Sequence, residues 1–128
     1  MHIYGYLQLV PLHNLLKYNI RNSIRELTRD DNFNRTCKKI GIDNQADRAE
    51  LVRRFHSNGI SDAGEIRKAV GVMAGKPGIT PEEVIAAKKV IKEAKRYGMK
   101  KKEIEESLEE KGITGDELKK AMYLIDKL

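Results

Sequence analysis

The sequence has no tryptophan, two phenylalanines and one cysteine (Cys37) among its 128 residues. A single cysteine excludes an internal disulfide and a cysteine-based zinc site. No stretch approaches the roughly 20 apolar residues that span a bilayer, so we expect no membrane contact. With few aromatic residues, the core must come from Leu, Ile, Val, Ala and Met. This composition favours packed helices over an aromatic-rich β-sandwich and predicts an all-α protein.

Cations are in excess, because 25 Lys and Arg face 19 Asp and Glu for a formal net charge of +6. Such an excess favours an anionic partner such as nucleic acid. The unpaired cysteine and the lack of a signal-peptide pattern predict a cytoplasmic protein. The C-terminal half is rich in Lys and Glu and has no Asn beyond Asn58. That bias is typical of a thermophile.

Residues 2–10 alternate loosely between two sides, which predicts a short strand or an extended arm. A lone strand needs a partner. We therefore expect this segment either to lie on the helices or to pair across a homodimer through residues 1–10.

Apolar periodicity and capping signals predict six to seven short helices in a compact bundle. Pro11 suits the first turn of the first helix, and the cluster Asp30-Asp31-Asn32 both ends it and caps the next. Thr80 and Thr114 each precede a glutamate by three residues, which is the capping-box spacing. The expected helices cover 11–29, 32–40, 45–58, Asp62 to the linker at Gly75, Thr80 to Gly98, about 100–111, and the segment after Thr114.

In the helix over 45–58, the residues expected to face inward are Ala46, Ala49, Leu51, Val52 and Phe55. The last helix shows a similar apolar stripe, formed by Leu118, Ala121, Met122 and Ile125.

Two segments of the chain resemble each other. Each has a helix ending in glycine (Gly59, Gly98), a Glu-Ile pair, a Gly-Ile-Thr turn and a capped helix. They predict two overlapping helix-turn-helix-like units of three helices that share the fifth helix. Duplication and chance similarity imposed by shared capping rules both remain open. The composition changes near 41–44, which predicts an N-terminal arm plus basic helical hairpin over 1–44 and a helical bundle over 45–128, or one domain that includes both.

The polar face of the helix over 11–29 carries Lys17, Arg21, Arg25 and Arg29 at four-residue steps. These cations could meet phosphates. They are equally compatible with a solvated face on which the helix dipole favours cations toward the C-terminus.

A second basic cluster lies near the turn at 96–102. Its candidate nucleic-acid-binding residues are Lys95, Arg96, Lys100, Lys101 and Lys102. Five glutamates follow at once, and this pattern favours surface ion pairs four residues apart as the other interpretation. Arg53 and Arg54 flank the core candidate Phe55 and complete the set of candidate phosphate contacts.

No catalytic triad or metal-ligand spacing occurs among the three histidines, so we expect no enzymatic activity, no cofactor and no metal. The charge and the helix-turn-helix rhythm predict a small DNA-binding or replication/transcription accessory protein, with DNA favoured over RNA. Its cations would converge from the two clusters into one phosphate footprint. The alternative is a protein–protein interaction module or homodimeric adaptor with no nucleic-acid role.

Overall fold

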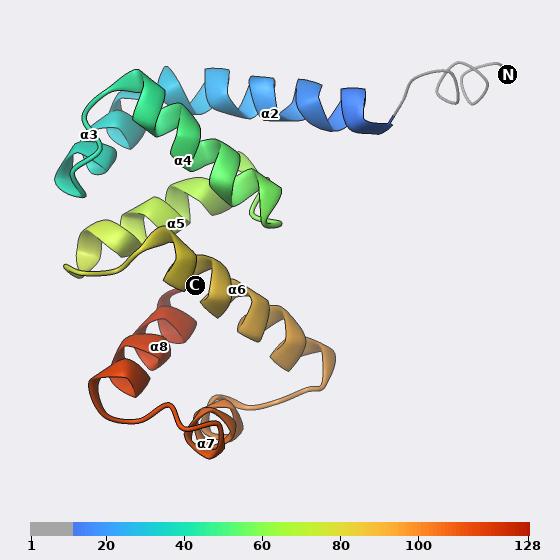
Figure 1. Cartoon of the computed structure of the whole chain (residues 1–128), viewed down its shortest axis with the longest axis vertical. Coiled ribbons are helices and arrows are strands. Elements are labelled where there is room, and N and C mark those ends of the chain that lie inside the picture. The colour runs from blue at the N-terminus through green and yellow to red at the C-terminus, as the bar shows by residue number, and fades with distance from the viewer. Residues whose placement is uncertain (1–11) are drawn as a thin grey trace, which may run out of the picture. The chain divides into compact units, whose positions relative to one another are not determined.

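The described residues are helical throughout. The computed structural model describes the backbone of residues 12–128 and the side chains of 20–128, and they form seven helices and no strand (Figure 1). The predicted all-α class is confirmed for this part of the chain. The strand or arm predicted for 2–10 lies outside the described residues. The helices are α2 (Leu12–Thr28), α3 (Asp31–Lys39), α4 (Gln45–Ser57), α5 (Ala63–Gly75), α6 (Pro81–Arg96), α7 (Lys101–Glu110) and α8 (Gly115–Lys127).

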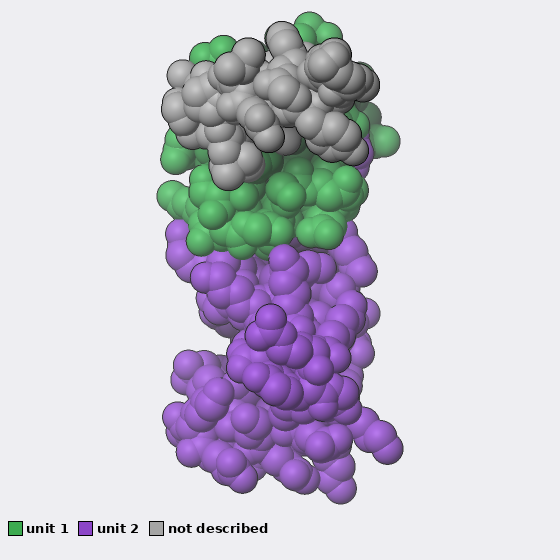
Figure 2. All heavy atoms as spheres, turned by 90° about the vertical axis from the view of Figure 1, so that its right-hand side faces the viewer, with its two compact units in different colours: residues 1–66 green, residues 67–128 purple. Residues whose placement is uncertain are grey.

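The chain divides into two compact units, residues 1–66 and 67–128, which Figure 2 colours separately. The boundary between them falls inside α5, after Ile66. The stretch 41–44, where the composition changes, connects α3 to α4 within the first unit. The division predicted at residue 44 stays a prediction.

In the first unit, α2 packs against both α3 and α4. Leu27, Phe33, Val52 and Phe55 are buried, and three of them are 0% exposed. The predicted cap at Asp30 is confirmed, since its Oδ1 accepts hydrogen bonds from the backbone N–H groups of Asn32 and Phe33. The apolar spacing read from the sequence therefore identifies the face that each of these helices buries.

The prediction that Ala46 faces inward is wrong, because this residue is exposed. Ala46 lies in the first turn of α4, on the same side as Glu50 and Arg53, which are also exposed. Residues four and seven positions apart share one face of a helix. The buried face of α4 starts instead at Ala49.

Cys37 is completely buried in the first unit. Burial raises the pKa of its thiol to about 11, and the nearby positive charge of Arg48 offsets only part of this effect. The thiol is therefore protonated at neutral pH and unreactive in the folded protein.

In the second unit, α8 packs against α6 and α7. Ala94, Ile104 and Leu108 form a buried cluster, which is covered by partly buried apolar side chains from α6, α8 and the adjoining turns. Lys120 on α8 donates to the carbonyl of Gly78 and pairs with Glu83, both at 3.0 Å. These contacts tie α8 to the start of α6.

The two copies of the internal repeat close their first turn with the same hydrogen bond. The backbone N–H of Ile60 donates to the carbonyl of Phe55, and that of Met99 donates to the carbonyl of Ala94, both at 2.9 Å. The intervening glycines have positive φ angles, 89° at Gly59 and 64° at Gly98. This is the Schellman closure of a helix end. The first copy (α4, α5, α6) crosses from one unit into the other, whereas the second (α6, α7, α8) lies within residues 67–128.

The two Gly-Ile-Thr turns differ. At the first, the Thr80 hydroxyl accepts from the N–H of Glu83 and the Glu83 carboxylate accepts from the N–H of Thr80, so the predicted capping box is confirmed. At the second, Thr114 is the N-cap residue as predicted, but it makes no side-chain cap hydrogen bond, so the predicted capping box is wrong. The following residue explains the difference. Pro81 presets a helical φ, whereas Gly115 begins α8 with φ +63°.

Candidate nucleic-acid interface

The α6–α7 corner, residues 95–102, contains five of the eleven predicted phosphate contacts. α6 ends at Arg96, and Tyr97 is its C-cap, with its backbone N–H directed to the carbonyls of Glu93 and Lys95. Gly98 then reverses the chain, and Lys100 is the N-cap of α7. The cations of this corner therefore lie on the end of α6, on the start of α7 and in the four residues between them.

The α6–α7 corner is the basic end of a longer basic segment. Residues 88–102 contain eight Lys and Arg and one acid, Glu93, whereas residues 103–110 contain five glutamates and no base. Of the five predicted contacts here, Lys101 pairs with Asp126 at 2.7 Å, which holds the pKa of that carboxyl below its usual range. Within the described residues, no ion pair involves the remaining four, which are Lys95, Arg96, Lys100 and Lys102.

Among the acids of α7, Glu103 contacts this corner through its carboxylate, which accepts a hydrogen bond from the backbone N–H of Lys100 at 3.1 Å. The ion pair of Lys101 is with Asp126 on α8 and not with a glutamate four residues away, and the other four cations form no ion pair among the described residues. All four are exposed.

The helix dipole accounts for the positions of two of these four cations. Lys95 and Arg96 occupy the last turn of α6, where the partial negative charge of a helix C-terminus favours them. Lys100 and Lys102 lie at the opposite kind of end, the N-cap and first turn of α7. A cation there is disfavoured by a few tenths to about 1 kcal/mol. Helix stability therefore does not account for Lys100 and Lys102.

Tyr97 is a part of this corner that the sequence analysis missed. Its side chain is 67% exposed, and among the described residues it is the only large apolar side chain with such exposure. It adjoins a small pocket of about 100 Å³ that Glu93, Met99, Ser107 and Lys111 also line. The available signal was the run Lys95-Arg96-Tyr97-Gly98, an aromatic residue between two cations and a helix-ending glycine.

The other predicted contacts lie in the first unit. Arg21 and Arg25 are exposed on α2, and Arg29 is exposed just beyond its end, while the side chain of Lys17 lies outside the described residues. On α4, Arg53 is 3.6 Å from Glu50, and Arg54 is exposed. The clusters on α2 and at the α6–α7 corner thus belong to different units, and their convergence into one footprint stays a prediction.

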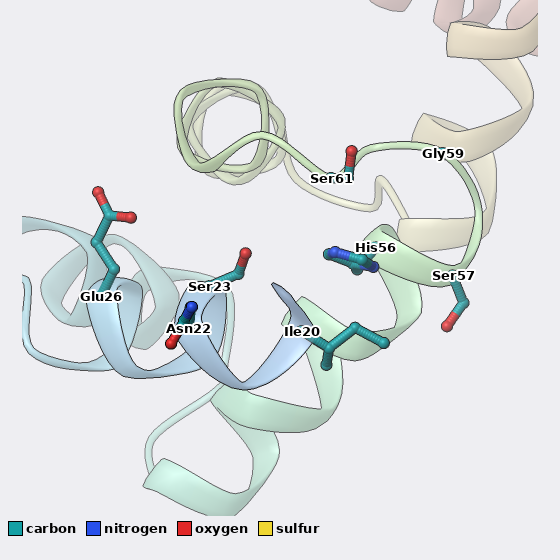
Figure 3. Close-up of a pocket in the computed structure, with 8 residues that line it drawn as sticks. All are labelled: Ile20, Asn22, Ser23, Glu26, His56, Ser57, Gly59 and Ser61. Carbon is teal, nitrogen blue, oxygen red and sulfur yellow. The ribbon is translucent and has the colours of Figure 1, made fainter. Parts of the chain in front are cut away.

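The first unit also contains a pocket of about 680 Å³ between α2, the end of α4 and the turn that follows. Figure 3 shows the His56 ring and the Glu26 carboxylate on different sides of this pocket. Most of the remaining polar lining consists of hydroxyl groups, those of Ser23, Ser57 and Ser61. In the described part of the chain, no three His, Cys, Asp or Glu side chains are grouped so that they could hold a metal ion. We assign this pocket no chemistry.

Comparisons with protein families, curated proteins and solved structures found no match to this chain. None of the helices in the described residues is both long enough and apolar enough to span a membrane.

Proposed function

We propose that the protein is a cytoplasmic nucleic-acid-binding accessory protein of replication or transcription, with DNA as the favoured partner, and that the α6–α7 corner contacts phosphates. The observation that carries the proposal is the position of Lys100 and Lys102 at the N-terminal end of α7. Their charge opposes the helix dipole, and no acid among the described residues pairs with them. The Glu103 carboxylate binds the backbone N–H of Lys100 and not the ammonium groups, which an anionic polymer would contact instead.

Two further features support a phosphate contact. The excess of seven cations over residues 88–102 is large enough to produce a local positive field in a chain whose total net charge is +6. The row of Arg21, Arg25 and Arg29 gives the first unit a second exposed basic face, which would strengthen binding if both meet the same strand. Phosphate contacts of this kind fix position and supply affinity without reading base sequence.

The experiment is a salt titration of DNA binding followed by fluorescence anisotropy. Each lost phosphate contact lowers the slope of log affinity against log salt by about 0.9 for duplex DNA. The double variant Lys100→Ser/Lys102→Ser should therefore bind more weakly and show a slope smaller by about 1.8.

The matched control is Lys119→Ser/Lys127→Ser, which removes the same charge from exposed positions on α8. It should change affinity and slope much less. Absence of binding at low salt would refute the proposed function. Equal losses in the two double variants would show that net charge alone, and not the α6–α7 corner, attracts DNA.

A protein–protein interaction module is the second candidate, and one observation favours it. A mainly apolar hollow of about 180 Å³ lies between α6, α7 and α8, with Val90, Ala121 and Ile125 in its lining. It would accept an apolar side chain from a partner. Sedimentation of the full chain and of a chain lacking residues 1–10 tests the homodimeric form of this proposal, which a strictly monomeric full chain would contradict.

A further inference from the structure

We infer that the α6–α7 corner binds single-stranded nucleic acid, with the ring of Tyr97 stacked on an unpaired base. The inference rests on the proposed function and adds the class of nucleic acid to it. It starts from the exposure of Tyr97, whose side chain is 67% accessible among cations that face solvent.

The backbone around Tyr97 is well fixed, although its ring is exposed. The N–H of Tyr97 is directed to the carbonyls of Glu93 and Lys95, and the N–H of Met99 donates to the carbonyl of Ala94 at 2.9 Å. Both bonds belong to the C-terminal closure of α6, which is anchored by the buried Ala94. An aromatic ring on a fixed turn loses little conformational entropy when a flat ligand stacks on it.

The charges on either side of Tyr97 suit a flexible polyanion. Lys95 and Arg96 precede the ring, and Lys100 and Lys102 follow it, all exposed. Proteins that bind single strands combine a basic track for the phosphates with aromatic side chains for the bases. In a duplex the faces of the bases are covered by their neighbours, so an aromatic side chain on a surface turn gains nothing from stacking there.

The small pocket beside Tyr97 is lined by one charge of each sign, Glu93 and Lys111. Arg96, Lys100 and Lys102 would hold the phosphates, and the base would face the pocket. A carboxylate such as Glu93 can accept a hydrogen bond from the exocyclic amino group of a base.

The test measures binding of a labelled oligothymidine of about 16 nucleotides, the matched oligouridine and a duplex of the same length. The wild-type protein should bind the single strands more tightly than the duplex. The variant Tyr97→Ala should lose about 5- to 150-fold in affinity for single strands, which corresponds to the 1–3 kcal/mol of one stacked base. Its salt slope should stay unchanged, because no charge is removed.

Three comparisons separate stacking from other effects. Tyr97→Phe keeps the ring and should retain the affinity. Tyr123→Phe, on α8, is the control for loss of a phenolic hydroxyl elsewhere. Tyr97→Trp places the only tryptophan in the chain at the corner, and its emission should be quenched by single strands and not by the duplex. Circular dichroism of each variant verifies the fold, which an exposed ring does not stabilise.

The outcomes distinguish this inference from the proposed function. Equal binding of duplex and single strand, with no loss in Tyr97→Ala, would overturn the inference and leave a phosphate-binding protein. Failure of every oligonucleotide to bind at low salt would overturn both. The oligothymidine and oligouridine arms show whether the corner prefers the DNA or the RNA strand.

Discussion

At the α4–α5 corner the residue that caps the end of the first helix is Asn58, whereas at the α6–α7 corner it is Tyr97. The Asn58 side chain turns back and donates to the carbonyl of Arg54 at 2.8 Å, while the Tyr97 ring points into solvent. Both corners close on the same backbone hydrogen bond. The two corners therefore share their backbone closure and differ in the contacts that their side chains make.

The residues that start the next helix differ in the same way. Asp62 accepts a hydrogen bond from the N–H of Glu65 and caps α5, whereas Lys100 caps α7 with no side-chain acceptor. Ile60 is 1% exposed, and its counterpart Met99 is half-buried. In the first corner the side chains stabilise the fold. In the second the Glu103 carboxylate accepts a hydrogen bond from the N–H of Lys100 at 3.1 Å, whereas the Lys100 side chain makes no cap hydrogen bond.

The largest expected effect on stability comes from replacing the apolar residue that follows Gly59 or Gly98. Ile60→Ala should lower the free energy of unfolding by about 2–5 kcal/mol, because it leaves a cavity in the core. Met99→Ala should cost less, about 1–2 kcal/mol, because its side chain is only partly buried. Urea unfolding followed by circular dichroism measures both, and equal losses would show that the two corners are equally structural.

The next effect tests the shared backbone geometry. Gly98 has a positive φ of 64° and nothing within 4 Å of an added Cβ, so Gly98→Ala should cost about 1–2 kcal/mol from the backbone alone. Gly71 is the control, because it lies within α5 with equally open surroundings and ordinary φ. Gly71→Ala should stabilise by about 0.5–1 kcal/mol. A stabilising Gly98→Ala would contradict the positive-φ turn.

Exchanging the cap residue should move stability and binding in opposite directions. Lys100→Asp gives α7 the cap that Asp62 gives α5 and should raise the free energy of unfolding by about 1 kcal/mol. The same change should weaken nucleic-acid binding, because it replaces a cation by an anion. Urea unfolding and anisotropy on the same preparation measure the two effects. A gain in stability with unchanged affinity would show that Lys100 does not contact the nucleic acid.

The smallest effect concerns pH and the two Gly-Ile-Thr turns. Partial burial would raise the pKa of Glu83, but hydrogen bonds from Thr80 and Lys120 outweigh it and lower the pKa from its usual 4.5. A carboxyl with a lowered folded-state pKa stabilises the fold above its unfolded pKa, and this stabilisation is lost as pH falls through the folded value. Stability should therefore fall below about pH 4.5, and less so in Glu83→Gln.

Glu117, at the same place in the second turn, supplies the control for this pH profile. Thr114 forms no side-chain cap there, so Glu117→Gln should leave the profile as it is in the wild-type protein. If Glu83→Gln and Glu117→Gln weaken the pH dependence of stability equally, the capping box at Thr80 does not cause that dependence.

The helices and most caps could be predicted from sequence because their causes are local. Asp30 and Thr80 cap helices through neighbours two or three residues away, and apolar spacing finds the buried faces of α4 and α6. The failure at Thr114 is also local, but it depends on the φ that Gly115 adopts, and glycine leaves that angle free.

The candidate site was harder to predict because exposure and pairing depend on tertiary structure. The pairing of Lys101 with Asp126 joins α7 to α8 over 25 residues, so spacing within one helix could not reveal it. Tyr97 follows the last turn of α6, where helical periodicity no longer indicates which side is buried. Both facts follow from how α6, α7 and α8 pack.

The position of Cys37 gives the protein a built-in reporter of its own opening. It is the only thiol in the chain, it lies in the first unit, and it is completely buried. A thiol reagent can reach it only when the helices around it separate, so its rate of labelling measures the opening of that unit without any added probe. A labelling free energy below that of global unfolding would mean that residues 1–66 open while 67–128 stay folded.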